Sequence, residues 1–294
     1  MKQNKRRTAT VVYIFIFMLT VSGCVRKGKE QDKVYQETGM FEWSEAVCEP
    51  EEALYLAKEL GITKWYQETN GMTEVEATGK FVKALHNRKI EVYALLGAVE
   101  WGYEEDGATL LAHLEKIVQY NVQSSEKEKF DGVMLDIEPY ISDSWKENPE
   151  EYMDRYISCM KKGYKFAQKN HLRTAICIPR HYDNQGLTSG LEELIKETCD
   201  EVAVMNYSCG NEIEAIRTEA ALSEKYGKEL HCILEFQEVG KHGLTENKTY
   251  RNKGIDNAKE TWEKLQKEYK NINVTRDYHW SRPVREMLEE KNAD

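Results

Sequence analysis

The sequence predicts an α/β protein built as a (β/α)8 barrel, the TIM-barrel fold. Two observations support this prediction. The chain has 294 residues, and one barrel of this kind typically fills about 250. Short apolar segments typical of buried strands alternate eight times with longer segments of helical character, and no linker separates the pairs. Because catalytic groups of such barrels lie at the carboxyl ends of the strands, the fold also predicts where the active site lies.

The expected strands are short apolar runs. In the fourth of them, Val133, Leu135 and Ile137 fall on one face by the two-residue period of a strand, and the run stops at Pro139. The eight expected strands cover residues 41–43, 62–67, 90–99, 130–140, 172–179, 201–207, 230–236 and 277–280.

The expected helices follow these strands one by one. Proline fits the first turn of a helix and glycine its carboxyl end, so Pro50 and Gly61 mark the two ends of the first helix. The eight expected helices cover residues 50–60, 74–87, 109–122, 149–169, 191–198, 212–226, 256–269 and 283–291.

The fourth strand carries two acids close to its carboxyl end. By alternation, Asp136 and Glu138 share one face with Met134. Removing two neighbouring carboxylates from water is costly, and each charge raises the pKa of the other, as a general acid requires. Alternatively, Asp136 caps the following loop and Glu138 is solvated. Because the strand is otherwise so apolar, we interpret the pair as functional.

The ends of the other strands carry aromatic rings together with carboxylates, amides and hydroxyls. This mixture suits a sugar, whose ring has apolar C–H faces and polar edges. Each aromatic ring alone is as often a core residue as a ligand platform, and His279 alone is expected to be structural. The candidate substrate-binding residues are Tyr66, Glu100, Trp101, Met205, Glu235 and Trp280.

The first 24 residues resemble a bacterial lipoprotein signal. Four basic residues precede an apolar run over residues 11–21, which is too short for a comfortable membrane span. The run Val-Ser-Gly-Cys at residues 21–24 is similar to a lipobox, which implies cleavage before Cys24 and lipid on its sulfur; the alternative is an ordinary secretory signal. The expected parts are therefore a signal peptide (1–23), a lipidated polar tether (24–33) and a catalytic barrel (34–294), anchored on the extracytoplasmic face of a bacterial membrane.

Composition excludes several partners. Removal of the four basic residues of the signal takes the formal net charge from −10 to −14, and an acidic protein repels the phosphates of nucleic acid. The six other cysteines are scattered, with no CxxC pair and no interleaved histidines, so a zinc site is not expected. No spacing argues for a disulfide, although one remains possible outside the cell. We expect no metal, no organic cofactor and a monomer.

Two short motifs carry a resemblance to a known family. Residues 131–138, Asp-Gly-Val-Met-Leu-Asp-Ile-Glu, resemble the pattern Asp-Gly-x-Asp-x-Asp-x-Glu of glycoside hydrolase family 18, the chitinase-like barrels. Residues 205–207, Met-Asn-Tyr, are similar to the Met-x-Tyr element of that family. The resemblance implies that Glu138 is the catalytic acid, that Asp136 orients the substrate N-acetyl group and that Tyr207 hydrogen-bonds it. The substrate acetamide is then the nucleophile.

The sequence also departs from that pattern at two positions. Met134 stands in place of the middle aspartate, which removes one acid from the relay that adjusts the charge of Asp136, and Ser208 stands where an aspartate is common. Two alternatives therefore stay open. Glu138 and Glu235 are also similar to the paired acids of a retaining glycosidase, although Ile137 replaces the usual asparagine. Alternatively, the protein is a non-catalytic lipoprotein that binds glycan.

The intact acid pair at residues 136 and 138 counts against a protein that only binds glycan, because such a protein has no need of two buried acids. We therefore expect a membrane-anchored, extracytoplasmic glycoside hydrolase that acts on an N-acetylhexosamine-containing glycan.

Overall fold

The computed structural model describes residues 37–44, 49–70 and 75–293, all of which belong to one compact unit, Gln36–Asp294. The expected signal peptide, Cys24 and the tether lie outside the described residues. Within the described part of the chain, no helix has both the length and the apolar character needed to cross a membrane.

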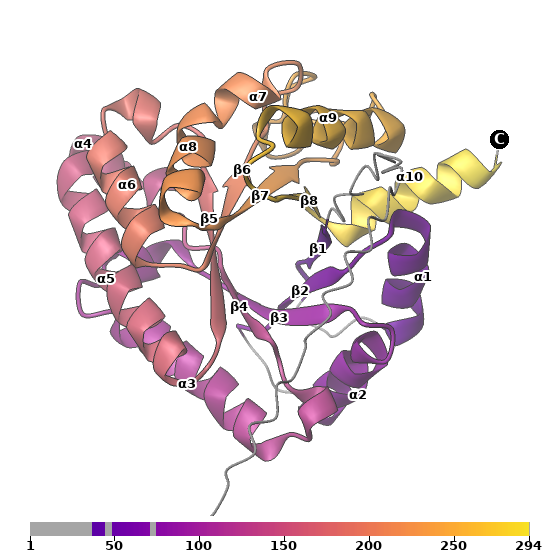
Figure 1. The fold of residues 1–294 in the computed structure, drawn as a ribbon, viewed down its shortest axis with the longest axis horizontal. Helices are drawn as coiled ribbons and strands as arrows, with labels where there is room; N and C mark the ends of the chain where they lie inside the picture. Colours follow the sequence, from indigo (N-terminus) through magenta and orange to yellow (C-terminus); the bar gives the residue numbers. More distant parts are fainter. Residues whose placement is uncertain (1–36, 45–48, 71–74, 294) are drawn as a thin grey trace, which may run out of the picture. The chain divides into compact units, whose positions relative to one another are not determined.

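Eight parallel strands form a closed barrel, in which each strand pairs with the next along the chain and the last pairs with the first. The helices lie outside the ring of strands (Figure 1). The predicted (β/α)8 fold is therefore confirmed. The strands are β1 (Thr38–Glu42), β2 (Lys64–Glu68), β3 (Glu91–Leu96), β4 (Gly132–Leu135), β5 (Arg173–Pro179), β6 (Glu201–Met205), β7 (Glu229–Leu234) and β8 (Val274–Tyr278).

The helices begin and end largely where the sequence signals lie. Pro50 occupies the first turn of α1, and Gly61 ends that helix in a left-handed conformation with a φ of 72°. The α-helices are α1 (Pro50–Leu60), α2 (Val75–His86), α3 (Ala108–Gln123), α4 (Asp143–Glu147), α5 (Pro149–Lys169), α6 (Thr188–Glu197), α7 (Glu212–Ala215), α8 (Arg217–Tyr226), α9 (Ile255–Glu268) and α10 (Ser281–Ala293). The 3-10 helices are η1 (Val99–Tyr103), η2 (Glu126–Glu128), η3 (Pro139–Ile141), η4 (Asp183–Gln185) and η5 (Lys241–Gly243).

Some expected boundaries are wrong. The fourth strand ends at Leu135 rather than at the proline, because the backbone at Glu138 has left the extended region, with φ −113° and ψ 64°, and leads into η3. The last strand covers 274–278 instead of 277–280. The helix expected over 212–226 is two helices, since Ile216 has a φ of −126°, outside the helical range.

The barrel interior is filled by side chains that alternate along the strands. A continuous apolar layer occupies its middle, while a second and larger core lies between the sheet and the helices. The interior is therefore a packed core and not a channel. The interior layer consists of Phe41, Tyr66, Tyr93, Leu95, Met134, Ala175, Cys177, Ala203, Met205 and Ile233.

Charged side chains fill the amino-terminal end of the barrel. The Lys64 ammonium lies 3.0 Å from Glu201, and the Arg173 guanidinium lies 2.8 Å from the same carboxylate. The two ring nitrogens of His231 lie 2.8 Å from Glu201 and 2.9 Å from Asp277. These five residues, the basal ion cluster, come from five different strands. Because buried charges are stable only when they are paired, the cluster depends on closure of the whole barrel.

Pairing in this cluster changes the protonation of both partners. Burial raises the pKa of Glu201, but His231, Lys64 and Arg173 outweigh burial and hold that pKa well below its usual range. Burial lowers the pKa of His231, but Asp277 and Glu201 outweigh it and raise the pKa to about 9. At neutral pH, His231 is therefore a cation between two carboxylates.

The raised pKa of His231 predicts how stability depends on pH. A group whose pKa is higher in the folded state stabilises the fold by binding a proton, so this contribution is complete below about pH 6.5 and is lost as pH rises through about 9. We expect His231→Gln to lower the free energy of unfolding much more at about pH 6 than at about pH 10, measured by urea unfolding. The exposed residue His242 of η5 supplies the control, His242→Gln. Equal destabilisation by His231→Gln at both pH values would contradict the prediction.

Candidate active site

The main chain after β4 is held by a close contact with the end of β3. The Asp136 amide donates to the Leu96 carbonyl oxygen over 2.8 Å, and a Cβ atom on Gly97 would lie 1.8 Å from the Asp136 carbonyl oxygen. The Asn70 side chain bonds the amide and the carbonyl of Gly97, at 3.1 and 2.7 Å. Only glycine fits at position 97, and the contact fixes where the Asp136 side chain starts.

Asp136 lies on top of the apolar interior layer. The Cys177 thiol lies beside its carboxyl group and donates a hydrogen bond to the Met134 sulfur over 3.5 Å. Burial and the neighbouring Glu138 raise the pKa of Asp136 to about 7, while His279 opposes the rise. The residue is partly exposed, yet its Oδ1 atom is inaccessible and has no partner among the described residues.

Glu138 follows two residues later and is also partly buried. Its Oε1 atom accepts a hydrogen bond from the hydroxyl of Tyr140, whose ring packs edge-on against His181, 5.2 Å away, and against Tyr182, 5.9 Å away. The sequence analysis did not identify Tyr140 as a site residue. Its position in the sequence, directly after Glu138 and Pro139, was the signal that could have identified it.

Tyr207 reaches the same region from the end of β6. Its ring packs edge-on against the imidazole of His279, with centroids 5.4 Å apart. Its hydroxyl is inaccessible and has no partner among the described residues. Burial and the charges of Glu235, Asp136 and Glu138 raise the pKa of Tyr207 well above its usual value, so the phenol remains a hydrogen-bond donor. Met205 lies one layer deeper, at 9 % exposure.

Glu235, after β7, is held on all sides. Its Oε1 accepts the amides of Phe236 and Gln237 at 2.7 and 2.8 Å, and its Oε2 accepts the Gln237 side chain at 3.1 Å. The same Oε2 lies 2.7 Å from Nδ1 of His279. Burial raises the pKa of Glu235, but His279 and the two amides outweigh it and lower the pKa to about 2. Burial lowers the pKa of His279, but Glu235 outweighs it and raises that pKa.

The structure corrects two of the predicted substrate contacts. Tyr66 is completely buried inside the barrel, and its hydroxyl lies 3.2 Å from His231 and 3.4 Å from Asp277. Trp101 is only 7 % exposed and packs on His113 of α3, with ring centroids 4.4 Å apart. Both rings are core residues, because β2 continues past Tyr66 and because the chain turns outward into η1 at Trp101.

Of the other predicted contacts, Glu100 and Trp280 are accessible, whereas Met205 and Glu235 are buried. Glu100 is exposed on η1. Trp280 is partly exposed just after β8, beside a hollow of about 350 Å³ that also borders Gln237 and Arg282. The Arg282 guanidinium lies 6.0 Å from the centre of the Trp280 ring. The residues that come together at the carboxyl end of the barrel are thus Asp136, Glu138, Tyr207, Glu235 and His279.

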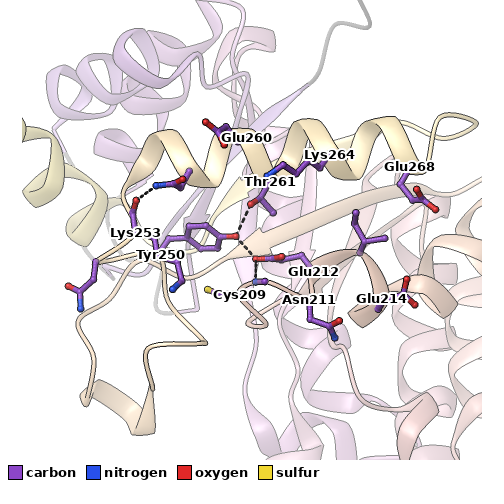
Figure 2. Close-up of a pocket in the computed structure, with 14 residues that line it drawn as sticks. Cys209, Asn211, Glu212, Glu214, Tyr250, Lys253, Glu260, Thr261, Lys264 and Glu268 are labelled. Atoms are coloured by element: carbon purple, nitrogen blue, oxygen red, sulfur yellow. Dashed lines mark hydrogen bonds between the residues drawn. The ribbon is translucent and has the colours of Figure 1, made fainter.

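A larger hollow of about 800 Å³ is lined by other residues (Figure 2). It is bordered by the chain after β6, by α7 and by α9. The Tyr250 hydroxyl at its base donates to Glu212 and lies 2.8 Å from the Thr261 hydroxyl. Its buried polar groups satisfy one another, and it contains none of the predicted site residues.

One group of residues has the geometry of a metal site. Glu201, Glu229 and His231 each offer a ligand atom, and these atoms lie within 4.8 Å of one another. However, Lys64 lies 3.0 and 3.4 Å from the two glutamates, and Arg173 lies 2.8 Å from both. Protein cations already neutralise the two carboxylates, and His231 is protonated, so this group does not fit a metal ion.

Comparison with solved structures gives chitinases among similar folds. No protein-family model and no curated protein matches the sequence. A chitinase from Bacteroides thetaiotaomicron superposes with a TM-score of 0.55 at 13% identity, over 87% of this chain and 98% of the other. The spore cortex-lytic enzyme SleL of Bacillus megaterium QM B1551 gives 0.52 at 13%, over 87% and 74%. A xylose isomerase domain protein from Planctomyces limnophilus gives 0.51 at 14%, over 89% and 97%. The expected likeness to chitinase barrels is confirmed for the fold.

The contact between Gly97 and Asp136 predicts that Gly97→Ala is destabilising. The added methyl group would overlap the Asp136 carbonyl, so β3 and β4 must move apart, at a cost of about 1–3 kcal/mol or more. Urea unfolding measures the loss. Gly79→Ala in α2 is the matched control: its Cβ would meet only ordinary contacts at 3.7 Å or more, and alanine is the better helix former. Wild-type stability in Gly97→Ala would contradict the assigned role.

Proposed function

We propose that the protein is a glycoside hydrolase that acts on an N-acetylhexosamine-containing glycan by a substrate-assisted retaining mechanism. One observation carries the proposal. Oδ1 of Asp136 and the hydroxyl of Tyr207 are buried with no partner among the described residues, and they belong to the same group of residues as Glu138. Buried polar atoms are normally hydrogen-bonded, and unsatisfied ones at a site indicate a ligand group that completes them. An acetamide does so, because it offers an N–H to the carboxylate and a carbonyl oxygen to the phenol.

The proposed reaction follows from these positions. The acetamide oxygen attacks the anomeric carbon while the bond to the leaving oxygen breaks and Glu138 gives that oxygen its proton. Asp136 holds the acetamide N–H, and its negative charge stabilises the positive oxazolinium ring that forms. Glu138 then takes a proton from water as the water opens that ring at the anomeric carbon. The Tyr140 hydroxyl holds the Glu138 carboxyl group in place through both steps.

The geometry argues against the alternative in which Glu235 is the nucleophile. Its carboxylate is only 2 % exposed, three protein hydrogen bonds engage its oxygens, and His279 lies beside it. A pKa lowered to about 2 also makes it a weak base and a weak nucleophile. The retained acid pair at 136 and 138 favours an enzyme over a protein that only binds glycan, since a binder gains nothing from a buried acid whose pKa is raised. The chitinase among the similar folds agrees with this proposal.

The proton donor is tested by Glu138→Gln, which keeps the shape of the side chain and removes the acid. Turnover should fall about 100-fold to 10,000-fold, while glycan binding changes little. The assay is product formation from cell-wall, mucin and N-glycan substrates, followed by mass spectrometry. The control Glu147→Gln changes an exposed glutamate in α4, in the segment that follows β4. Near wild-type turnover in Glu138→Gln would rule out the assignment.

The same assay separates the two mechanisms. A thiazoline that mimics the cyclised intermediate should inhibit, because a site complementary to that species binds its mimic more tightly than the substrate. A covalent sugar on Glu235, detected by peptide mass after reaction with a 2-fluoro glycoside, would instead establish the paired-carboxylate mechanism.

We also propose that the protein is anchored by lipid on Cys24 at the extracytoplasmic face of the membrane. The support is in the sequence alone: a basic start, a short apolar run and the lipobox-like residues 21–24.

Cys24→Ala should abolish this attachment. Without the thiol there is no acceptor for the lipid, so the protein should stay uncleaved or be shed. Cell fractionation and the mass of the mature amino terminus measure both outcomes. Cys209→Ala changes another cysteine and should leave attachment intact. A Cys24→Ala protein that matures normally and remains with the membrane would exclude the lipobox.

A further inference from the structure

The hollow of about 800 Å³ beside α7 and α9 shares its walls with the proposed active site (Figure 2). One wall is the chain that follows Tyr207 and continues into α7. Another contains Tyr250, whose amide donates to the Glu235 carbonyl oxygen over 2.7 Å. The Cys209 amide donates to the Asn247 carbonyl oxygen over 2.8 Å and so joins the two walls. The backbone that carries Tyr207 and Glu235 therefore also supports the hollow.

A glutamate in the lining of the hollow has one carboxylate oxygen that is not used by the protein. The Glu212 side chain is only 7 % exposed. Its Oε1 accepts the Gly210 amide over 2.9 Å and the Tyr250 hydroxyl, which lies 2.8 Å from the Thr261 hydroxyl. Its Oε2 remains accessible and forms no hydrogen bond within the described part of the chain. A largely desolvated carboxylate with a free oxygen favours a positively charged donor on a ligand.

Charged groups of both signs surround this glutamate. Four glutamates and two lysines line the hollow, so its formal charge is −2. The two lysines, Lys253 and Lys264, are exposed, and neither pairs with a carboxylate in the part of the chain that the structure describes. Lys264 shares one face of α9 with Asn257, Thr261 and Glu268, which recur at intervals of three or four residues. The hollow therefore offers an acceptor for an ammonium group and donors for a carboxylate or a carbonyl oxygen.

Two other classes of ligand fit the hollow less well. A sugar ring packs on an exposed aromatic face, but Tyr250 is the one aromatic residue among the described residues of the lining, and it is only 3 % exposed. A metal ion needs several ligand atoms, and among the described residues three suitable groups come together at Glu201, Glu229 and His231, outside the hollow. A peptide, in contrast, offers an ammonium group, amides and a carboxylate in one molecule.

We propose that this hollow binds a peptide with a free ammonium group, which pairs with Oε2 of Glu212 while Lys253 and Lys264 contact the carboxylate or carbonyl oxygens of the peptide. The contacts of the hollow alone support this binding site. Its use in catalysis rests on the proposed function: the substrate is then an N-acetylhexosamine glycan that carries short peptides, and the hollow holds such a peptide while the sugar occupies the barrel mouth.

The tripeptide Ala-Ala-Ala tests the binding site in the purified full-length protein. Its addition should shift the amide NMR signals of Gly210 and Thr261, and calorimetry gives the Kd. Acetylation of the tripeptide amino group removes the ammonium and should weaken binding about tenfold or more, because a hydrogen bond between charged groups is lost. Glu212→Gln should weaken binding of the free tripeptide by a similar factor and leave binding of the acetylated one unchanged, since the two changes remove the same interaction.

A second variant does not disturb the buried side of the hollow. Lys264→Gln changes an exposed, unpaired side chain and should weaken binding of the free tripeptide severalfold. Glu263→Gln and Lys267→Gln are the matched controls, because both residues are exposed on α9 outside the lining, and they should bind like the wild type. Equal Kd values for the free and the acetylated tripeptide would overturn the inference. So would an N-acetylglucosamine oligomer that shifts the signals of the hollow when the tripeptide does not.

Turnover tests the substrate class separately. For a peptide-substituted N-acetylglucosamine oligomer, Glu212→Gln should raise KM about tenfold with little change in kcat, because the hollow contacts the peptide and not the reacting atoms. Equal KM values of the wild type for oligomers with and without peptide would overturn the substrate class. If the tripeptide binds the hollow and no glycan is cleaved, the proposed function fails and the peptide site stands. If glycans are cleaved and the tripeptide does not bind, the proposed function stands and the peptide site is overturned.

Discussion

Closure of the barrel is the constraint on which the rest of the structure depends. Eight parallel strands joined edge to edge point every second side chain into a space that excludes water. Apolar residues fill the middle of that space, and polar residues are tolerated only where they are paired or where a ligand completes them. The two ends of the interior meet this requirement differently. At the amino-terminal end the buried ions have counter-ions, whereas at the carboxyl end Oδ1 of Asp136 and the hydroxyl of Tyr207 are buried with no partner among the residues that the structure describes.

Because of this difference, one end of the barrel interior stabilises the fold and the other end carries the proposed active site. Glu201 and Asp136 are both acids that adjoin the barrel interior, but Glu201 has three cationic neighbours and its pKa is held low. Asp136 has one, together with a neighbouring acid, and its pKa is raised to about 7. A carboxylate stabilises the fold in the first setting, and in the second it is available to a bound ligand. The apolar layer between them separates the two electrostatic environments.

Much of the fold and part of the site could be predicted from sequence because both depend on local pattern. Apolar runs indicate the strands, and residues such as Pro50 and Gly61 mark the ends of helices, because both signals act between residues close in sequence. The alternation of strand residues placed Asp136 and Glu138 on one face. Tyr66 was misplaced because its height in the barrel depends on how far β2 continues and on its register with β1 and β3. The contact between Glu235 and His279 joins two strands 44 residues apart, and no local pattern contains it.

The basal ion cluster also bears on how cooperatively this molecule unfolds. Lys64 belongs to β2, Arg173 to β5, Glu201 to β6, His231 to β7 and Asp277 to β8. A chain that has formed only its first half offers Lys64 the partly exposed Glu37 and Glu91, at 3.0 and 3.9 Å, but not the buried Glu201, and its strand edges are unpaired. The final strand completes both the sheet and the charge balance. Because these ion pairs join strands from both halves of the chain, we expect the barrel to unfold as one cooperative unit.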